Sequence, residues 1–224
     1  MMSSDEGNGP EGELDLARLV TRGFESPDLD YKAPGGWTQW SDAEKAELIR
    51  DLASMGNSHR PGWIIIGVEE GDAGTFVGAG ITDDQASGFD PTPIGLWAKN
   101  YIDPPIQFRI HKPRLDGRLY AAIQVQPFQT VPHVCVRNYG SVLHEAAIYI
   151  RTDACQTAKI SNAAQMRALI DRATTNSADA LVARIDEIYR RAGSAARLSV
   201  AATDARALFG QQLREIEELP GGAS

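Results

Sequence analysis

Apolar and polar residues alternate along the chain with two periods, and these periods predict a mixed α and β structure. A nearly unbroken apolar run at residues 63–68 indicates a buried strand, and a shorter strand is expected at residues 29–32. Between them a helix is expected to begin after Ser41, which with Glu44 can form a capping box, and to reach Gly56. These elements form a β-α-β unit, which can bring the two strand ends side by side.

The second half of the domain is predicted to contain short strands. Residues 106–111 alternate apolar and polar side chains, and residues 119–125 supply a second strand across Asp116-Gly117, a sequence typical of a hairpin turn. Before this hairpin, a helix is expected from Asp90-Pro91 to Tyr101. Further strands at 133–136 and 146–150 precede a helix at 162–173, capped by Ser161. The predicted fold is α+β, a mixed β-sheet flanked by helices.

The two ends of the chain differ from this domain. Residues 1–12 hold Gly, Ser and acidic residues with little to bury, so they are expected to be disordered. Residues 13–175 form the predicted α+β domain, and residues 176–224 a helical extension. One stripe of the extension is apolar, and it comprises Leu181, Val182, Ile185, Ile188 and Tyr189. The stripe either packs back on the domain or binds a partner, which would be a second copy or an effector protein.

Composition narrows the cellular context. No apolar run approaches the roughly 20 residues that cross a bilayer, and the acidic start lacks a basic and then apolar leader. We therefore expect a soluble, cytoplasmic protein with no membrane partner. The two cysteines, Cys135 and Cys155, have no C-x-x-C spacing and are expected to be reduced structural thiols.

The formal net charge of −8 argues against a nucleic-acid partner until its distribution is considered. Residues 61–105 carry seven acidic side chains and one lysine, whereas residues 106–160 carry seven basic and three acidic ones. This basic half is a candidate surface for phosphate groups. The candidate nucleic-acid-binding residues are Arg109, Lys112, Arg137, Arg151 and Lys159, together with Arg60 on an earlier loop.

Three segments carry a family resemblance. They read Glu25-Ser26-Pro27-Asp28-Leu29-Asp30-Tyr31-Lys32, Asp51-Leu52-Ala53-Ser54-Met55-Gly56-Asn57 and Trp63-Ile64-Ile65-Ile66-Gly67-Val68-Glu69-Glu70. With Ala147-Ile148-Tyr149-Ile150-Arg151 further on, they make residues 18–175 similar to the Schlafen AlbA-like domain family. The resemblance implies an α+β domain that binds nucleic acid. It also implies a metal-dependent endonuclease activity on transfer RNA or other structured nucleic acid, in stress or phage defence.

The resemblance implies a nuclease site at Glu25, Asp30 and Glu70, with Lys32 beside them. Three carboxylates at one point repel each other unless a divalent cation lies between them, and oxygen ligands suit Mg²⁺ or Mn²⁺. Asp30 and Lys32 are two apart on a strand and are expected to share a face. Asp30 stands where the family usually has Glu, and Glu70 where its nucleases tend to have Asp. Glu69 is the alternative third acid.

Two other functions are open at this stage. In the first, the acids are inert, and the domain is a non-catalytic DNA-binding, regulatory or assembly module whose C-terminal helices recruit a partner. In the second, a small-molecule or nucleotide sensor uses the glycine-rich residues 67–80. No phosphate-binding G-x-x-x-x-G-K-[ST] sequence supports the sensor. The sequence leaves the choice between DNA and RNA open.

Overall fold

A four-stranded sheet with the strand order β1-β2-β9-β6 organises the domain. β1 (Leu29–Lys32) pairs in parallel with β2 (Gly62–Ile66). β9 (Ala121–Val125) runs antiparallel to both β2 and β6 (Phe108–His111). α2 (Asp42–Gly56) connects the parallel pair and begins at the predicted capping box of Ser41 and Glu44. The sheet is mixed and carries helices, so the α+β fold class is confirmed.

The protein is described here by a computed structural model of residues 10–217, with side chains at 16–72 and 74–191. The chain divides after Thr174 into a first unit, which holds the sheet, and a second unit, which belongs to helix α5 (Ala163–Glu217). Residues 1–9 of the segment expected to be disordered lie outside the described residues, and α1 (Pro10–Thr21) follows them. None of the helices in the described part of the chain has an apolar stretch long enough to cross a membrane.

Each face of the sheet has its own core. On one face Ile64 and Ile66 of β2 pack with α2 in the larger cluster of buried residues. On the other face Leu29 and Ile65 pack with α1, which contributes Leu16 and Val20. Successive side chains of a strand point to opposite faces, so the apolar run in β2 fills both cores. This alternation also places Asp30 and Lys32 on the α2 face, where the candidate site is formed.

The apolar run is not one continuous strand, because it breaks at Gly67. Gly67 has a φ of 106°, and β3 (Val68–Glu70) leaves the sheet to pair with β4 (Phe76–Gly78). A Cβ at this position would lie 3.1 Å from the backbone of Gly80 and from the ring of Tyr120. The predicted strand at 63–68 is therefore wrong beyond residue 66, and Glu70 lies on a separate hairpin.

The predicted hairpin between β6 and β9 is confirmed. Its tip contains β7 (Arg114–Leu115) and β8 (Arg118–Leu119), joined by Asp116 and Gly117 with φ of 49° and 77°. These positive φ angles explain the Asp-Gly pair. η1 (Asp72–Gly74) joins β3 to β4. Between β4 and β6 lie α3 (Asp83–Ser87), α4 (Pro91–Lys99) and β5 (Ile102–Asp103). α4 starts at Pro91 as predicted, with Asp90 as its cap, but ends at Lys99 and not at Tyr101.

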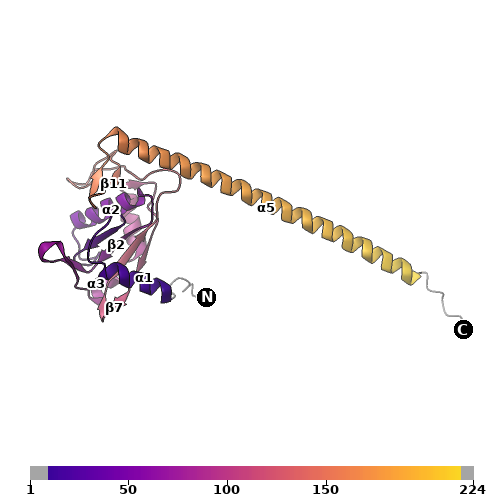
Figure 1. Cartoon of the computed structure of the whole chain (residues 1–224), viewed down its shortest axis with the longest axis horizontal. Helices are drawn as coiled ribbons and strands as arrows, with labels where there is room; N and C mark the ends of the chain where they lie inside the picture. Colours follow the sequence, from indigo (N-terminus) through magenta and orange to yellow (C-terminus); the bar gives the residue numbers. More distant parts are fainter. Residues whose placement is uncertain (1–9, 218–224) are drawn as a thin grey trace. The chain divides into compact units, whose positions relative to one another are not determined.

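The last part of the first unit packs on α2. β10 (Val134–Cys135) pairs with β5, and β11 (Tyr149–Arg151) pairs with β12 (Thr157–Lys159), a strand that was not predicted. β11 lies against α2 (Figure 1). α5 is capped by Asn162, whose Oδ1 accepts a hydrogen bond from Gln165 N, and not by Ser161. The helix also continues past 173, where it was predicted to end. Cys135 and Cys155 are both free, as expected.

Candidate nucleic-acid interface

A buried network of charges surrounds Asp30, one of the predicted acids. Arg151 donates a hydrogen bond to Asp30 Oδ1 at 2.9 Å, and Lys32 Nζ lies 2.9 Å from Asp30 Oδ2. Lys32 also donates to Asp51 Oδ2 of α2 at 2.5 Å. The side chains of Asp30, Asp51 and Arg151 are only 7%, 2% and 3% exposed. Asp30 and Lys32 do share a face, and their charges are balanced by Asp51 and Arg151 of the protein itself.

The network holds Lys32 in its charged form. Desolvation by burial lowers the pKa of Lys32, but the attraction of Asp51 and then of Asp30 outweighs it, and the pKa is raised. Lys32 is therefore protonated at any physiological pH. Its ammonium group joins β1 to α2, while Arg151 joins β1 to β11. The network thus ties together three elements that lie far apart in the sequence.

Glu25 and Glu70, the other two predicted acids, have different surroundings. Glu25 Oε1 accepts a hydrogen bond from the backbone N–H of Tyr31 at 3.1 Å. Desolvation by burial raises the pKa of Glu25, and the negative charge of Asp30 adds to the rise. Glu70 is exposed on the hairpin of β3 and β4, where it pairs across with Phe76. Glu69, the alternative acid, is exposed on the same hairpin.

These residues do not fit the Mg²⁺ or Mn²⁺ site that the resemblance implies. Both oxygens of Asp30 already face cationic side chains. No three His, Cys, Asp or Glu side chains in the described part of the chain are grouped closely enough to hold a metal ion. The donor set needed for a hard divalent cation is therefore not assembled, and we derive no metal-dependent step from this geometry.

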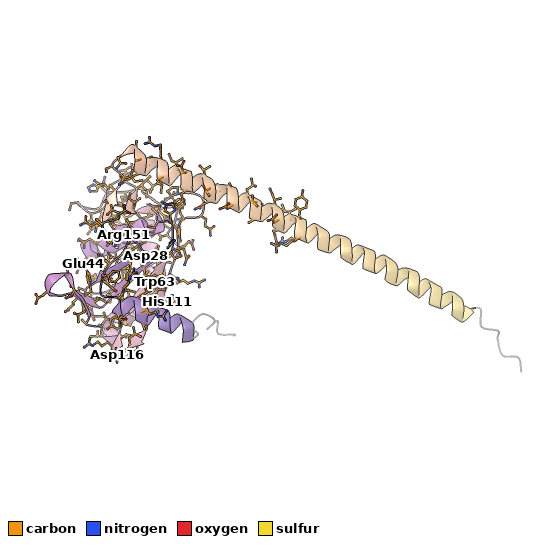
Figure 2. The ribbon with its side chains drawn as sticks, viewed as in Figure 1. Asp28, Glu44, Trp63, His111, Asp116 and Arg151 are labelled. Carbon is orange, nitrogen blue, oxygen red and sulfur yellow. The ribbon has the colours of Figure 1, made fainter. Side chains whose placement is uncertain are left out.

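A groove of about 410 Å³ opens next to this network, and we name it the arginine groove. Its walls come from the segment before β1, the loop between α2 and β2, the end of β11, and the first turns of α5. Figure 2 labels two lining residues, Asp28 and Arg151. Its lining residues are Pro27, Asp28, Asn57, Ser58, His59, Arg60, Ile150, Arg151, Asp153, Gln165, Ala168, Leu169 and Arg172.

Asn57 fixes the loop that forms one wall of the arginine groove. Its Nδ2 donates hydrogen bonds to the carbonyls of His133 and Tyr149, both at 2.9 Å, and its Oδ1 accepts one from His133 N at 2.9 Å. Asn57 is 1% exposed, so these bonds are shielded from water. The side chain thereby anchors the end of α2 to β10 and β11. His59 and Arg60, just beyond it, are exposed.

Arg172 was not among the predicted residues, yet it is central to the arginine groove. It donates a hydrogen bond to the carbonyl of Asn57, and its guanidinium lies 5.6 Å from the centroid of the Phe128 ring. Burial lowers its pKa. Residues 165, 168, 169 and 172 have helical spacing, so a shared face was predictable, whereas the contact with the loop was not.

The lining of the groove carries charges of both signs. Burial lowers the pKa of His59, and the positive charges of Arg172 and Arg60 lower that pKa further. Asp28 and Asp153 also line the groove, so its three arginines face two acids. Ile150 and Leu169 supply apolar surface beside them. The arrangement can hold a ligand that combines an anionic group with a flat apolar group.

The structure does not gather the other predicted basic residues in the arginine groove. Arg109 lies on the edge strand β6 and Lys112 just after it, and both are exposed. Arg137 is exposed after β10, and Lys159 is exposed on β12. Of the six predicted basic residues, Arg60 and Arg151 line the groove, and Arg151 is the one already paired with Asp30.

Two solved structures are similar to this chain in part. The DIP2311 protein from Corynebacterium diphtheriae is 15% identical to this chain, with a TM-score of 0.46. The match covers 72% of this chain and 32% of the DIP2311 chain. The N-terminal domain of a Nitrosomonas europaea protein described as related to the RecG ATP-dependent DNA helicase is 12% identical with a TM-score of 0.36. That match covers 59% of this chain and 87% of the domain. This chain thus spans about a third of the DIP2311 protein.

A search of curated proteins gave no match. The family model described as "Schlafen, AlbA_2" matches residues 25–159, a segment that includes β1, α2, β2, the β6–β9 hairpin and β11. The match begins at Glu25 and contains Asp30, Lys32, Asp51, Asn57 and Arg151. Because it covers more than half of the chain, the protein belongs to the Schlafen AlbA_2 family.

Proposed function

We propose that this protein binds nucleic acid, and that a single strand contacts it through the arginine groove. The observation that carries the proposal is the meeting of Arg60 and Arg172 beside an apolar wall, with Arg151, already paired with Asp30, at its base. Guanidinium groups bind phosphate oxygens, and apolar or aromatic surface accepts bases in sequence-tolerant single-strand binding. Membership of the Schlafen AlbA_2 family supports a nucleic-acid-related function.

The size of the arginine groove favours a single strand over a duplex. A volume of about 410 Å³ is that of a small-ligand pocket, for which about 300–1,000 Å³ is typical. Such a groove accepts a nucleotide or two and excludes a double helix. The ligand would place a phosphate at Arg60 and Arg172 and its base or sugar on Ile150 and Leu169.

Binding of labelled single-stranded RNA, single-stranded DNA and duplex DNA tests this proposal by fluorescence anisotropy over a salt series. Arg60→Glu should weaken single-strand binding and reduce the slope of log K against log salt by about 0.7 for each lost phosphate contact. Arg114→Glu is the matched control, since Arg114 forms an exposed ion pair with Asp83 on another part of the domain. Ala168→Trp fills the groove without changing the charge and should also weaken binding.

The proposal fails if Arg60→Glu and Ala168→Trp bind as the wild type does. Weakening by Arg109→Glu instead would place the contact on the basic edge strand β6. Salt-independent binding of free nucleotides, with no binding of strands, would favour the sensor that uses residues 67–80.

Metal-dependent cleavage of transfer RNA stays a separate prediction. It would require Asp30 to exchange Arg151 and Lys32 for a cation. Incubation of labelled transfer RNA with Mg²⁺, Mn²⁺ or EDTA, for the wild type and for a Glu25→Ala, Asp30→Ala, Glu70→Ala variant, tests it. Cleavage that depends on metal and is lost in the variant would establish the activity. Binding without cleavage would leave the non-catalytic module.

A further inference from the structure

The second unit presents a row of exposed apolar side chains on α5. Leu181, Val182, Ile185, Ile188 and Tyr189 are 60%, 57%, 42%, 59% and 74% exposed. At 100° per residue, these five positions fall within one stripe of the helix. Scattered apolar residues need no explanation, but a contiguous row of five on one helix face indicates a covered surface.

The spacing of this stripe continues along the sequence. Steps of three and four residues lead from Ala178 to Ile216, and ten of the twelve positions are apolar. The positions are Ala178, Leu181, Ile185, Ile188, Ala192, Ala195, Ser199, Ala202, Arg206, Phe209, Leu213 and Ile216. An apolar repeat of this period over more than five heptads is the pattern of a coiled coil.

We propose that α5 pairs with α5 of a second copy of this chain. α5 has 55 residues, whereas a typical globular helix has about 11–12, and helices in proteins owe most of their stability to the packing of one apolar face. A second copy supplies a partner of the same length with the same repeat. In a pair related by a two-fold axis, the same surface of both helices forms the interface, so one contact buries the exposed stripe of each.

The charged residues beside the stripe do not set the direction of pairing. In the repeat, Arg184 and Arg191 lie next to the apolar positions on one edge, and Val182 and Tyr189 lie next to them on the other. Asp179 and Asp186 lie beyond Val182 and Tyr189, and Arg191 is paired with Glu187 of its own helix. Cross-linking therefore decides between parallel and antiparallel helices.

Pairing has a consequence for the first unit. It links two copies of that unit in one assembly, each joined to its helix before Thr175. Two linked binding sites raise the effective concentration of the second contact, so avidity exceeds single-site affinity. The pairing itself does not rest on the proposed function, and it is tested without nucleic acid.

Size-exclusion chromatography with light scattering on the full chain tests the pairing over a range of concentrations. We expect a mass of twice 24.3 kDa for the wild type and for Ala183→Glu, which changes the opposite face of α5. Ile185→Glu with Ile188→Glu should give the monomer mass. A monomeric wild type at 100 μM, roughly the upper end of working concentrations, would overturn the proposal and favour an effector partner.

Cross-linking tests the direction without depending on a disruptive variant. In a parallel two-fold pair residue 185 meets its own copy, so Ile185→Cys in a Cys155→Ser background should form a disulfide-linked dimer under mild oxidation. Ala183→Cys in the same background, on the outer face, should not. A dimer in which Ile185→Cys fails to cross-link would have antiparallel helices, and equal cross-linking of both variants would overturn pairing through the stripe.

Discussion

Asp51 offers a direct test of the charge network, because it is a buried acid that binds Lys32. It was not among the predicted site residues. Asp51→Asn keeps the shape of the side chain and removes its charge. Asp51 is 2% exposed, and Lys32, 29% exposed, lies 2.5 Å away. Removing one partner of a buried pair costs about 3–5 kcal/mol. Lys32 keeps Asp30 at 2.9 Å, so we expect the lower end, about 3 kcal/mol.

Denaturant and thermal unfolding measure this loss. At about 2–4 °C per kcal/mol for a chain of this size, Asp51→Asn should lower the melting temperature by about 6–12 °C. Asp42→Asn is the matched control on the same helix, because Asp42 is 61% exposed and pairs with Lys45 at 3.2 Å. It should cost about 1 kcal/mol or less. Equal losses for the two variants would refute the buried network.

The effect of Asp51→Asn should also depend on pH in one direction. The pKa of Lys32 is raised in the folded state, so its contribution to stability is fully present below the unfolded pKa of about 10.4. That contribution is lost as the pH rises through the higher folded pKa. The difference in unfolding free energy between wild type and Asp51→Asn should therefore be constant at neutral pH and shrink only above about pH 10. A difference that shrinks on acidification to pH 6 would contradict this assignment.

Three further predictions follow from single contacts. Glu25→Gln should raise the unfolding free energy at pH 7 and leave it unchanged near pH 3. The pKa of Glu25 is raised in the folded state, so the folded protein favours the protonated carboxyl, and ionisation of Glu25 lowers stability as the pH rises through that pKa. A loss of stability at pH 7 would contradict this. Asn57→Ala should cost about 3 kcal/mol or more in denaturant unfolding, since three buried hydrogen bonds are lost and their partners stay buried; a loss under 1 kcal/mol would contradict it. Gly67→Ala should destabilise by more than about 1 kcal/mol, whereas Gly95→Ala, in a helix with open space around it, should stabilise by up to about 1 kcal/mol; the same sign for both would argue against the Gly67 break.

Features set by neighbouring residues could be predicted from the sequence. The capping box of Ser41 and Glu44, the helix start at Asp90-Pro91 and the Asp116-Gly117 turn each depend on a few adjacent side chains, and all three are present. The break at Gly67 could not be predicted in this way. An apolar run looks the same whether it forms one strand or two, and the close approach of Gly80 and Tyr120 comes from distant parts of the chain.

The candidate site was predictable only in part, for the same reason. Asp30, Lys32 and Arg151 were selected from the sequence, and the structure brings them together. Their meeting depends on Asp51, which was not among the predicted site residues, and on the packing of β11 against α2. Arg172 was hidden in a similar way, because its partner is a backbone carbonyl 115 residues away in the sequence.

The charge balance of the network gives the acids a role that needs no metal. Asp30 holds Arg151 at the end of β11, and Asp51 holds Lys32 between β1 and α2. These same elements carry the segment before β1, the loop after α2 and the end of β11, which together form three walls of the arginine groove. A carboxylate neutralised by fixed cations positions those cations and their backbones, because separating a buried pair costs several kcal/mol, about 3–5. Loss of Asp30 should therefore weaken ligand binding through a displaced Arg151, even in a protein that cleaves nothing.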